Sequence, residues 1–112
     1  MTLFDITHGE RAGWQRQAAT ELAAILDAHP DLPVIAWTIG PAGATVVGRV
    51  HGLVCAGRVR DVFQMWRSAL AFAEHTETAS ADGTAFLRAS VTRNRVLLVL
   101  TATVFDDAGA PR

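Results

Sequence analysis

The sequence has no lysine and no tyrosine, and its 112 residues include one cysteine and one asparagine. All 10 basic residues are therefore arginines, and 11 acidic residues bring the formal net charge to −1. The chain therefore has no excess of basic residues of the kind that favours binding to nucleic acid or to acidic membranes. Abundant alanine, glycine and valine make the arginine bias typical of a GC-rich genome. The alternative explanation of the arginine bias is selection of arginine for bidentate contacts with anions.

Cys55 is the single cysteine, which excludes an internal disulfide and a thiolate metal cluster. One free thiol is typical of a reducing cytoplasm. The longest apolar runs, such as Val96 to Leu100, are far below the length of about 20 residues that crosses a bilayer. The chain also does not begin with a basic segment followed by an apolar run. We therefore expect a cytoplasmic protein with no signal peptide and no membrane partner.

The length and the hydrophobic content of 50% predict a single domain over residues 1–112 with its own core. The first helix starts with the capping-box spacing of Thr7 and Glu10 and ends before Pro30. A turn at Asp82–Gly83 allows a short extra edge strand over residues 77–79. Apolar periodicity and turn signals predict a helix over 8–29, a hairpin over 32–54, a helix over 58–75, a hairpin over 84–105 and a frayed tail over 106–112.

This order of elements predicts an α+β fold made of two αββ units. The second helix has an apolar stripe that includes Val62, Trp66 and Leu70. Such a stripe is most simply buried when both helices pack on one face of a four-stranded, mostly antiparallel sheet. Trp66 and Leu70 are then expected to be buried against the sheet.

Residue types that support catalysis or metal binding form no motif in this sequence. Cys55 lies in apolar surroundings, which leave a thiol unreactive. Glu74 and Glu77 are typical of solvated residues at the end of a helix. The histidines are spread over different elements: His8, His29, His51 and His75. We therefore expect no metal site, no cofactor and no enzymatic activity.

The last predicted strand, within 95–105, is apolar on both faces. A strand of this kind needs cover on both sides, and helices on one face of the sheet supply only one. The other face is therefore expected to be an exposed apolar patch with basic residues in it. Its candidate residues are Arg49, His51, Phe86, Arg88, Leu97, Val99 and Thr101.

Two interpretations of this patch remain open. Exposed apolar patches mark association sites, which favours a non-enzymatic interaction module that forms a homodimer, or binds another protein, through this face. The alternative is a nucleic-acid-binding domain, in which Phe86 stacks on a base while Arg49 and Arg88 hold phosphates. The near-neutral charge makes the homodimer the favoured prediction.

Four segments carry a resemblance to other proteins: Leu32–Ile39, Val47–Val50, Trp66–Leu70 and Val99–Val104. Together they resemble small proteins of unknown function that are common in actinobacterial genomes. The resemblance covers about the last three-quarters of the chain and rests mainly on core positions. It implies a bacterial cytoplasmic setting but no activity, and no functional residue is carried over from it.

Overall fold

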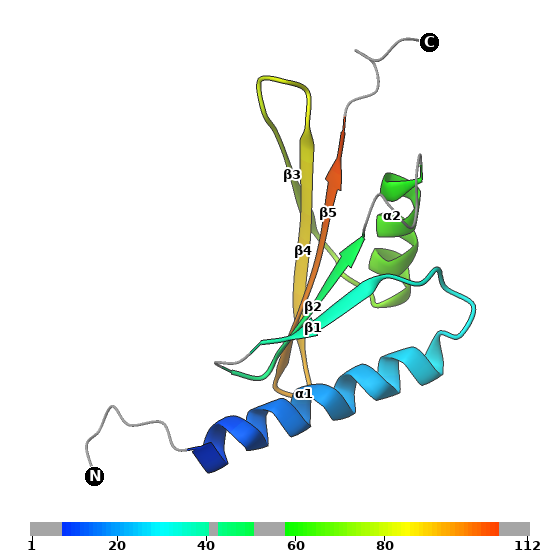
Figure 1. Ribbon diagram of the computed structural model, residues 1–112. Helices are drawn as coiled ribbons and strands as arrows, with labels where there is room; N and C mark the ends of the chain where they lie inside the picture. The colour runs from blue at the N-terminus through cyan, green and yellow to red at the C-terminus, as the bar shows by residue number, and fades with distance from the viewer. Residues whose placement is uncertain (1–7, 41–42, 51–57, 106–112) are drawn as a thin grey trace.

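The structure, a computed structural model, describes residues 8–40, 43–50 and 58–105. The α+β class predicted from the sequence is confirmed. Thr7, the predicted strand beyond Val50 and the tail over 106–112 lie outside the described residues. The elements, shown in Figure 1, are α1 (His8–Ala28), β1 (Ala36–Ile39), β2 (Thr45–Val50), α2 (Val59–Ala69), β3 (His75–Ala79), β4 (Ala85–Arg93) and β5 (Val96–Val104).

The sheet has five strands in the order β1-β2-β5-β4-β3. The predicted sheet of four strands is corrected, because the possible edge strand over 77–79 is present as β3. Three of the four strand pairs are antiparallel, but β2 and β5 pair in parallel, so the sheet is mixed. The most apolar strand, β5, is thereby placed at the centre of the sheet.

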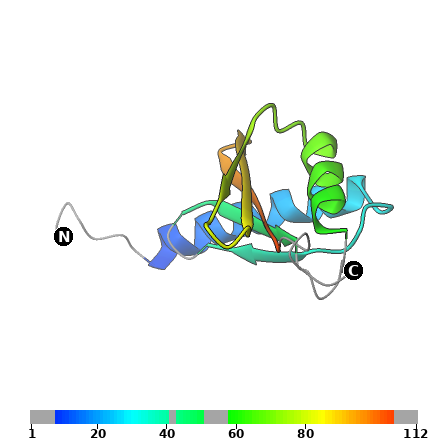
Figure 2. The same cartoon turned by 90° about the horizontal axis from the view of Figure 1, so that it is seen from above.

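The core lies on one face of this sheet, and residues of both helices contribute to it. Val46 and Leu98 on the sheet pack in the same hydrophobic cluster as Ile25 of α1 and Phe63 of α2. In Figure 1, α2 stands alongside the sheet and α1 runs across its lower end. Figure 2 shows α2 set to one side of the β4–β5 hairpin. In the described part of the chain, neither helix packs on the other face of the sheet.

Helix α2 ends at Ala69, whereas the apolar pattern predicted a helix as far as His75. Ala71 adopts a left-handed conformation with φ of 58°. The Phe72 N–H then donates to the Arg67 carbonyl oxygen at 3.0 Å, as in a Schellman motif. Phe72 follows the left-handed residue and lies outside the helix, but its side chain is buried. In the sequence it therefore continues the apolar pattern of α2 past the residue at which the helix ends.

Replacing Ala71 by glycine is expected to stabilise the protein by about 1 kcal/mol, because the left-handed conformation costs a residue with a Cβ atom about that much. Urea unfolding followed by circular dichroism measures this change. The control is Ala73→Gly at an exposed position without positive φ, where added chain entropy makes glycine neutral or unfavourable. Equal effects of the two substitutions would contradict the assigned helix end.

The hairpin predicted over 84–105 is formed by β4 and β5, and its turn is centred on Asn94 and Arg95. Both residues have positive φ, 51° and 66°, as a type I′ turn requires. The Asn94 side-chain amide donates to Glu21 Oε1 at 2.8 Å. The Gln17 amide donates to the Asn94 carbonyl oxygen, also at 2.8 Å. These bonds attach the middle of α1 to the end of the hairpin.

Candidate functional site

The side of the sheet turned away from the core is here named the outer face. Side chains along β2, β4 and β5 alternate between inner positions and outer positions, and the outer positions are the more exposed ones except at Val99, which is buried. Six of the seven predicted site residues lie on the outer face, and His51 lies outside the described residues. The outer positions of these three strands are Thr45, Val47, Arg49, Phe86, Arg88, Ser90, Thr92, Leu97, Val99, Thr101 and Thr103.

The strand register places both arginines of this face in one row. Arg49 is the partner of Thr101, and Thr101 is the partner of Arg88. Thr76 on β3 continues the row beyond Arg88. Because adjacent strands lie about 4.8 Å apart, the Cα atoms of Arg49 and Arg88 are separated by about 10 Å. Two long side chains at this spacing can reach the same ligand above Thr101, and we name these four residues the arginine row.

The guanidinium groups of Arg49 and Arg88 have no hydrogen-bond or ion-pair partner among the described residues. Both side chains are exposed. No outer position of the described strands carries a carboxylate. The outer face therefore combines two uncompensated positive charges, although the whole chain has a net charge of −1. This separation of charge favours an anionic ligand.

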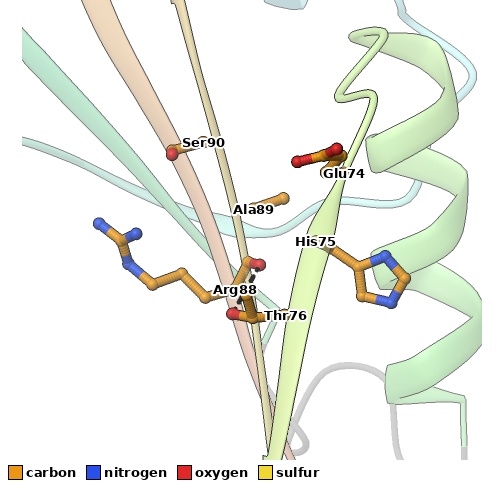
Figure 3. Close-up of a pocket in the computed structure, with 6 residues that line it drawn as sticks. All are labelled: Glu74, His75, Thr76, Arg88, Ala89 and Ser90. Atoms are coloured by element: carbon orange, nitrogen blue, oxygen red, sulfur yellow. Dashed lines mark hydrogen bonds between the residues drawn. The ribbon is translucent and has the colours of Figure 1, made fainter.

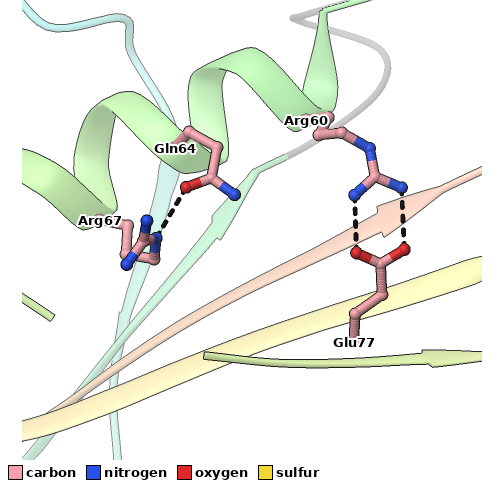
Figure 4. A network of polar contacts seen from close by, with 4 residues as sticks. All are labelled: Arg60, Gln64, Arg67 and Glu77. Carbon is pink, nitrogen blue, oxygen red and sulfur yellow. Dashed lines mark hydrogen bonds and ion pairs between the residues drawn. The ribbon is translucent and has the colours of Figure 1, made fainter. Parts of the chain in front are cut away.

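Arg60 and Arg67 of α2 have structural partners instead, as Figure 4 shows. Arg60 donates to both carboxylate oxygens of Glu77 on β3, at 2.7 and 3.0 Å. This hydrogen bonding lowers the pKa of Glu77 and raises the pKa of Arg60. Arg67 donates to Gln64 at 2.7 Å and to the Phe72 carbonyl oxygen at 3.1 Å. These two arginines attach α2 to β3 and to its own C-terminal loop.

The apolar part of the outer face is smaller than the strand pattern predicted. Phe86 is 47% exposed and Leu97 is 37% exposed, but Val99 is only 6% exposed. Val99 is flanked in register by Val47 and Ser90 on the neighbouring strands, and it is buried without any partner molecule. What remains is one exposed aromatic ring beside Arg88 and one exposed leucine towards the other end of β5.

A hollow of about 200 Å³ adjoins the arginine row where β3 begins. Figure 3 shows that Arg88 extends away from Glu74, and that the imidazole of His75 turns towards α2. The His75 ring packs edge-on against Phe63 with ring centroids 5.8 Å apart. The hollow is lined by Glu74, His75, Thr76, Arg88, Ala89 and Ser90. Its carboxylate was not a predicted site residue, because the sequence placed Glu74 in a solvated helix end.

A second hollow, of about 350 Å³, lies between the end of α1 and the start of β1. It is mainly apolar, and Val34 and Leu26 at its margin are exposed. Its histidine, His29, packs edge-on against Trp66 with ring centroids 6.3 Å apart. This hollow lacks the several convergent polar groups that orient a specific ligand.

The described residues contain no group of three or more histidine, cysteine, aspartate or glutamate side chains arranged to hold a metal ion. Neither described helix combines the length and the apolar character needed to cross a bilayer. Comparisons with protein-family models, with curated proteins and with solved structures found no match to the chain. Function is therefore inferred from the geometry of the outer face.

Proposed function

We propose that this protein is a non-enzymatic binding module that binds single-stranded nucleic acid on its outer face. The observation that supports this proposal is the arginine row. It holds two unpaired guanidinium groups on either side of Thr101, on a face whose described strands carry no carboxylate. A ligand that covers this row must supply negative charge.

Each part of the outer face would bind a different part of a nucleotide strand. Arg49 and Arg88 would donate to phosphate oxygens, for which the planar guanidinium is well shaped. The exposed ring of Phe86, two residues from Arg88 on the same face of β4, would stack on a base. Such stacking contributes about 1–3 kcal/mol per base and tolerates any base. An open sheet with an exposed aromatic ring is a common platform for single strands.

Self-association through the same face is the second candidate, because Phe86 and Leu97 are exposed hydrophobic residues on it. Two features make it the weaker one. A two-fold pairing of outer faces would bring two arginine rows together. The described strands of these faces carry no carboxylate, and the nearby Glu74 lies in the hollow on the far side from the Arg88 guanidinium, so like charges would meet across the interface at a cost of several kcal/mol. Val99 is already buried, so a partner gains little by covering it.

The double variant Arg49→Ala/Arg88→Ala is expected to bind a fluorescently labelled single-stranded RNA or DNA at least tenfold more weakly than the wild type, as measured by fluorescence anisotropy at low salt. Two phosphate contacts to a single strand predict a slope of about −1.4 in a plot of log affinity against log salt, and the variant should flatten it. The matched control is Arg11→Ala/Arg16→Ala on α1, which removes the same charge from exposed positions of that helix. Its affinity should change little.

Failure of the wild type to bind any single strand at low salt would rule out this function. Analytical ultracentrifugation of the same samples tests the second candidate. A stable dimer that Leu97→Glu converts to a folded monomer would show that the outer face binds a second copy instead. A monomer that binds RNA or DNA through the two arginines supports the proposal.

A further inference from the structure

We infer that the hollow at the start of β3 is a base-selective subsite for guanine, with Glu74 as the residue that selects it. This inference rests on the proposed function, because the hollow is a continuation of the arginine row. Thr76 and Arg88 belong to both. A nucleotide strand that runs along β4 and crosses the row at Arg88 therefore passes the mouth of the hollow.

The spacing along β4 fits consecutive parts of one nucleotide strand. Phe86, Arg88 and Ser90 follow one another on the outer face, each two residues from the next. Two residues of a strand span about 6.8 Å, so Phe86 and Ser90 are about 14 Å apart with Arg88 midway between them. A phosphate held by Arg88 would place one neighbouring base over Phe86 and the other at the hollow beside Ser90.

Glu74 provides the chemistry of selection. Its carboxylate lies at the hollow, where Figure 3 shows it on the far side from the Arg88 guanidinium. It has no hydrogen-bond or ion-pair partner among the described residues. An ionised carboxylate only accepts hydrogen bonds, and it can accept two in parallel. The hollow therefore needs a ligand edge that presents two adjacent donors.

Guanine is the base with such an edge, since its N1–H and its N2 amino group lie side by side on the Watson–Crick edge. Adenine and cytosine each place a ring acceptor beside their amino group, and uracil places carbonyl oxygens on both sides of its N–H. Single-stranded bases are commonly recognised on this edge. The Ser90 hydroxyl lines the same hollow and can donate to the O6 atom of guanine, whereas the Thr76 hydroxyl donates to the Arg88 carbonyl oxygen at 3.4 Å.

The size of the hollow agrees with a single base. Its volume of about 200 Å³ is below the range of about 300–1,000 Å³ found for pockets that enclose whole drug-sized ligands. The hollow would therefore hold one base while the sugar and phosphate remain on the open sheet.

The test uses labelled oligouridines with one central guanosine, inosine or adenosine, titrated against the full-length protein by anisotropy. Inosine lacks only the N2 amino group of guanosine. Wild-type protein is expected to bind the guanosine oligomer about tenfold more tightly than the other two, within the range of one two-pronged base contact. Glu74→Gln should remove this preference while plain oligouridine binds as before or slightly more tightly.

Asp61→Asn is the matched control, because it removes the same charge from an exposed position on α2, and no residue of α2 lines the hollow. It should keep the preference for guanosine, and circular dichroism melting checks that both variants fold. Equal binding of guanosine and inosine oligomers by the wild type, or a preference that survives in Glu74→Gln, would overturn the guanine subsite and leave the proposed function in place. Absence of binding to every oligomer would overturn both.

Discussion

Replacing Trp66 by alanine is expected to lower the free energy of unfolding by about 3–5 kcal/mol, the range typical of removing a buried aromatic side chain. Trp66 is 2% exposed at the centre of the core. Its indole N–H donates to the Pro33 carbonyl oxygen at 2.8 Å. Its ring packs edge-on against Trp37, with ring centroids 5.3 Å apart. The substitution therefore leaves a cavity and also an unsatisfied acceptor in the segment before β1.

Chemical unfolding followed by far-ultraviolet circular dichroism measures this effect. The control is Met65→Ala on the same helix, whose side chain is partly exposed and should cost much less. A domain of this size has a total stability of about 5–15 kcal/mol, so the Trp66 variant is expected to be partly unfolded at physiological temperature. A loss below about 1 kcal/mol would show that this face of α2 does not pack against the sheet.

Replacing Gly48 by alanine is expected to destabilise the protein by about 1–3 kcal/mol, although alanine is normally the better residue in a strand. A Cβ atom at this position would lie 2.7 Å from Cζ3 of Trp37, inside van der Waals contact. Gly48 and Trp37 are partners in the β1–β2 register, and the indole covers the glycine. Displacing this ring also disturbs its contact with Trp66.

Repeating Gly48→Ala in a Trp37→Leu background separates the clash with the indole from effects on the backbone. The loss of stability caused by Gly48→Ala should largely disappear in that background. Gly13→Ala on α1 is the opposite case, since its added Cβ would meet nothing closer than 4.0 Å. There alanine should stabilise the helix by up to about 1 kcal/mol. A stabilising effect of Gly48→Ala would contradict the close packing of the Trp37 indole against Gly48.

The assignment of strand residues to the two faces of the sheet was predictable from the sequence. Val46, Leu98 and Leu100 point into the core, and Arg49 and Arg88 point away from it, as the period of two predicts. The alternation of apolar and polar residues can be seen within a single strand, and it is clear here because only one face of the sheet is buried. The burial of Trp66 and Leu70 followed in the same way from the period of the helix.

Features that depend on contacts distant in sequence were not predictable in this way. No local signal shows that β5 pairs in parallel with β2, because strand order is decided by how the apolar strands share one core. The end of α2 was missed for a different reason. Ala71 stands where glycine is the usual residue, and the buried Phe72 continues the apolar pattern past the true end of the helix.

The candidate site was predictable as a list of residues but not as an arrangement. Periodicity placed Arg49, Arg88 and Thr101 on one face, but their position in a single row depends on the registers of two strand pairs. The burial of Val99 depends on the neighbours that those registers supply. Glu74 could not be linked to Arg88, because it reaches the hollow only when the chain leaves α2 early and enters β3.

The central place of β5 has a consequence for how this chain folds. β5 is the last of the described strands to be synthesised, yet it alone joins the β1–β2 hairpin to the β3–β4 hairpin. A two-stranded hairpin in water is at best marginally stable by itself. Until β5 has left the ribosome, β2 and β4 each lack a partner strand on one side, and such open strand edges favour aggregation. The sheet then forms largely after synthesis, through distant contacts that make folding slow.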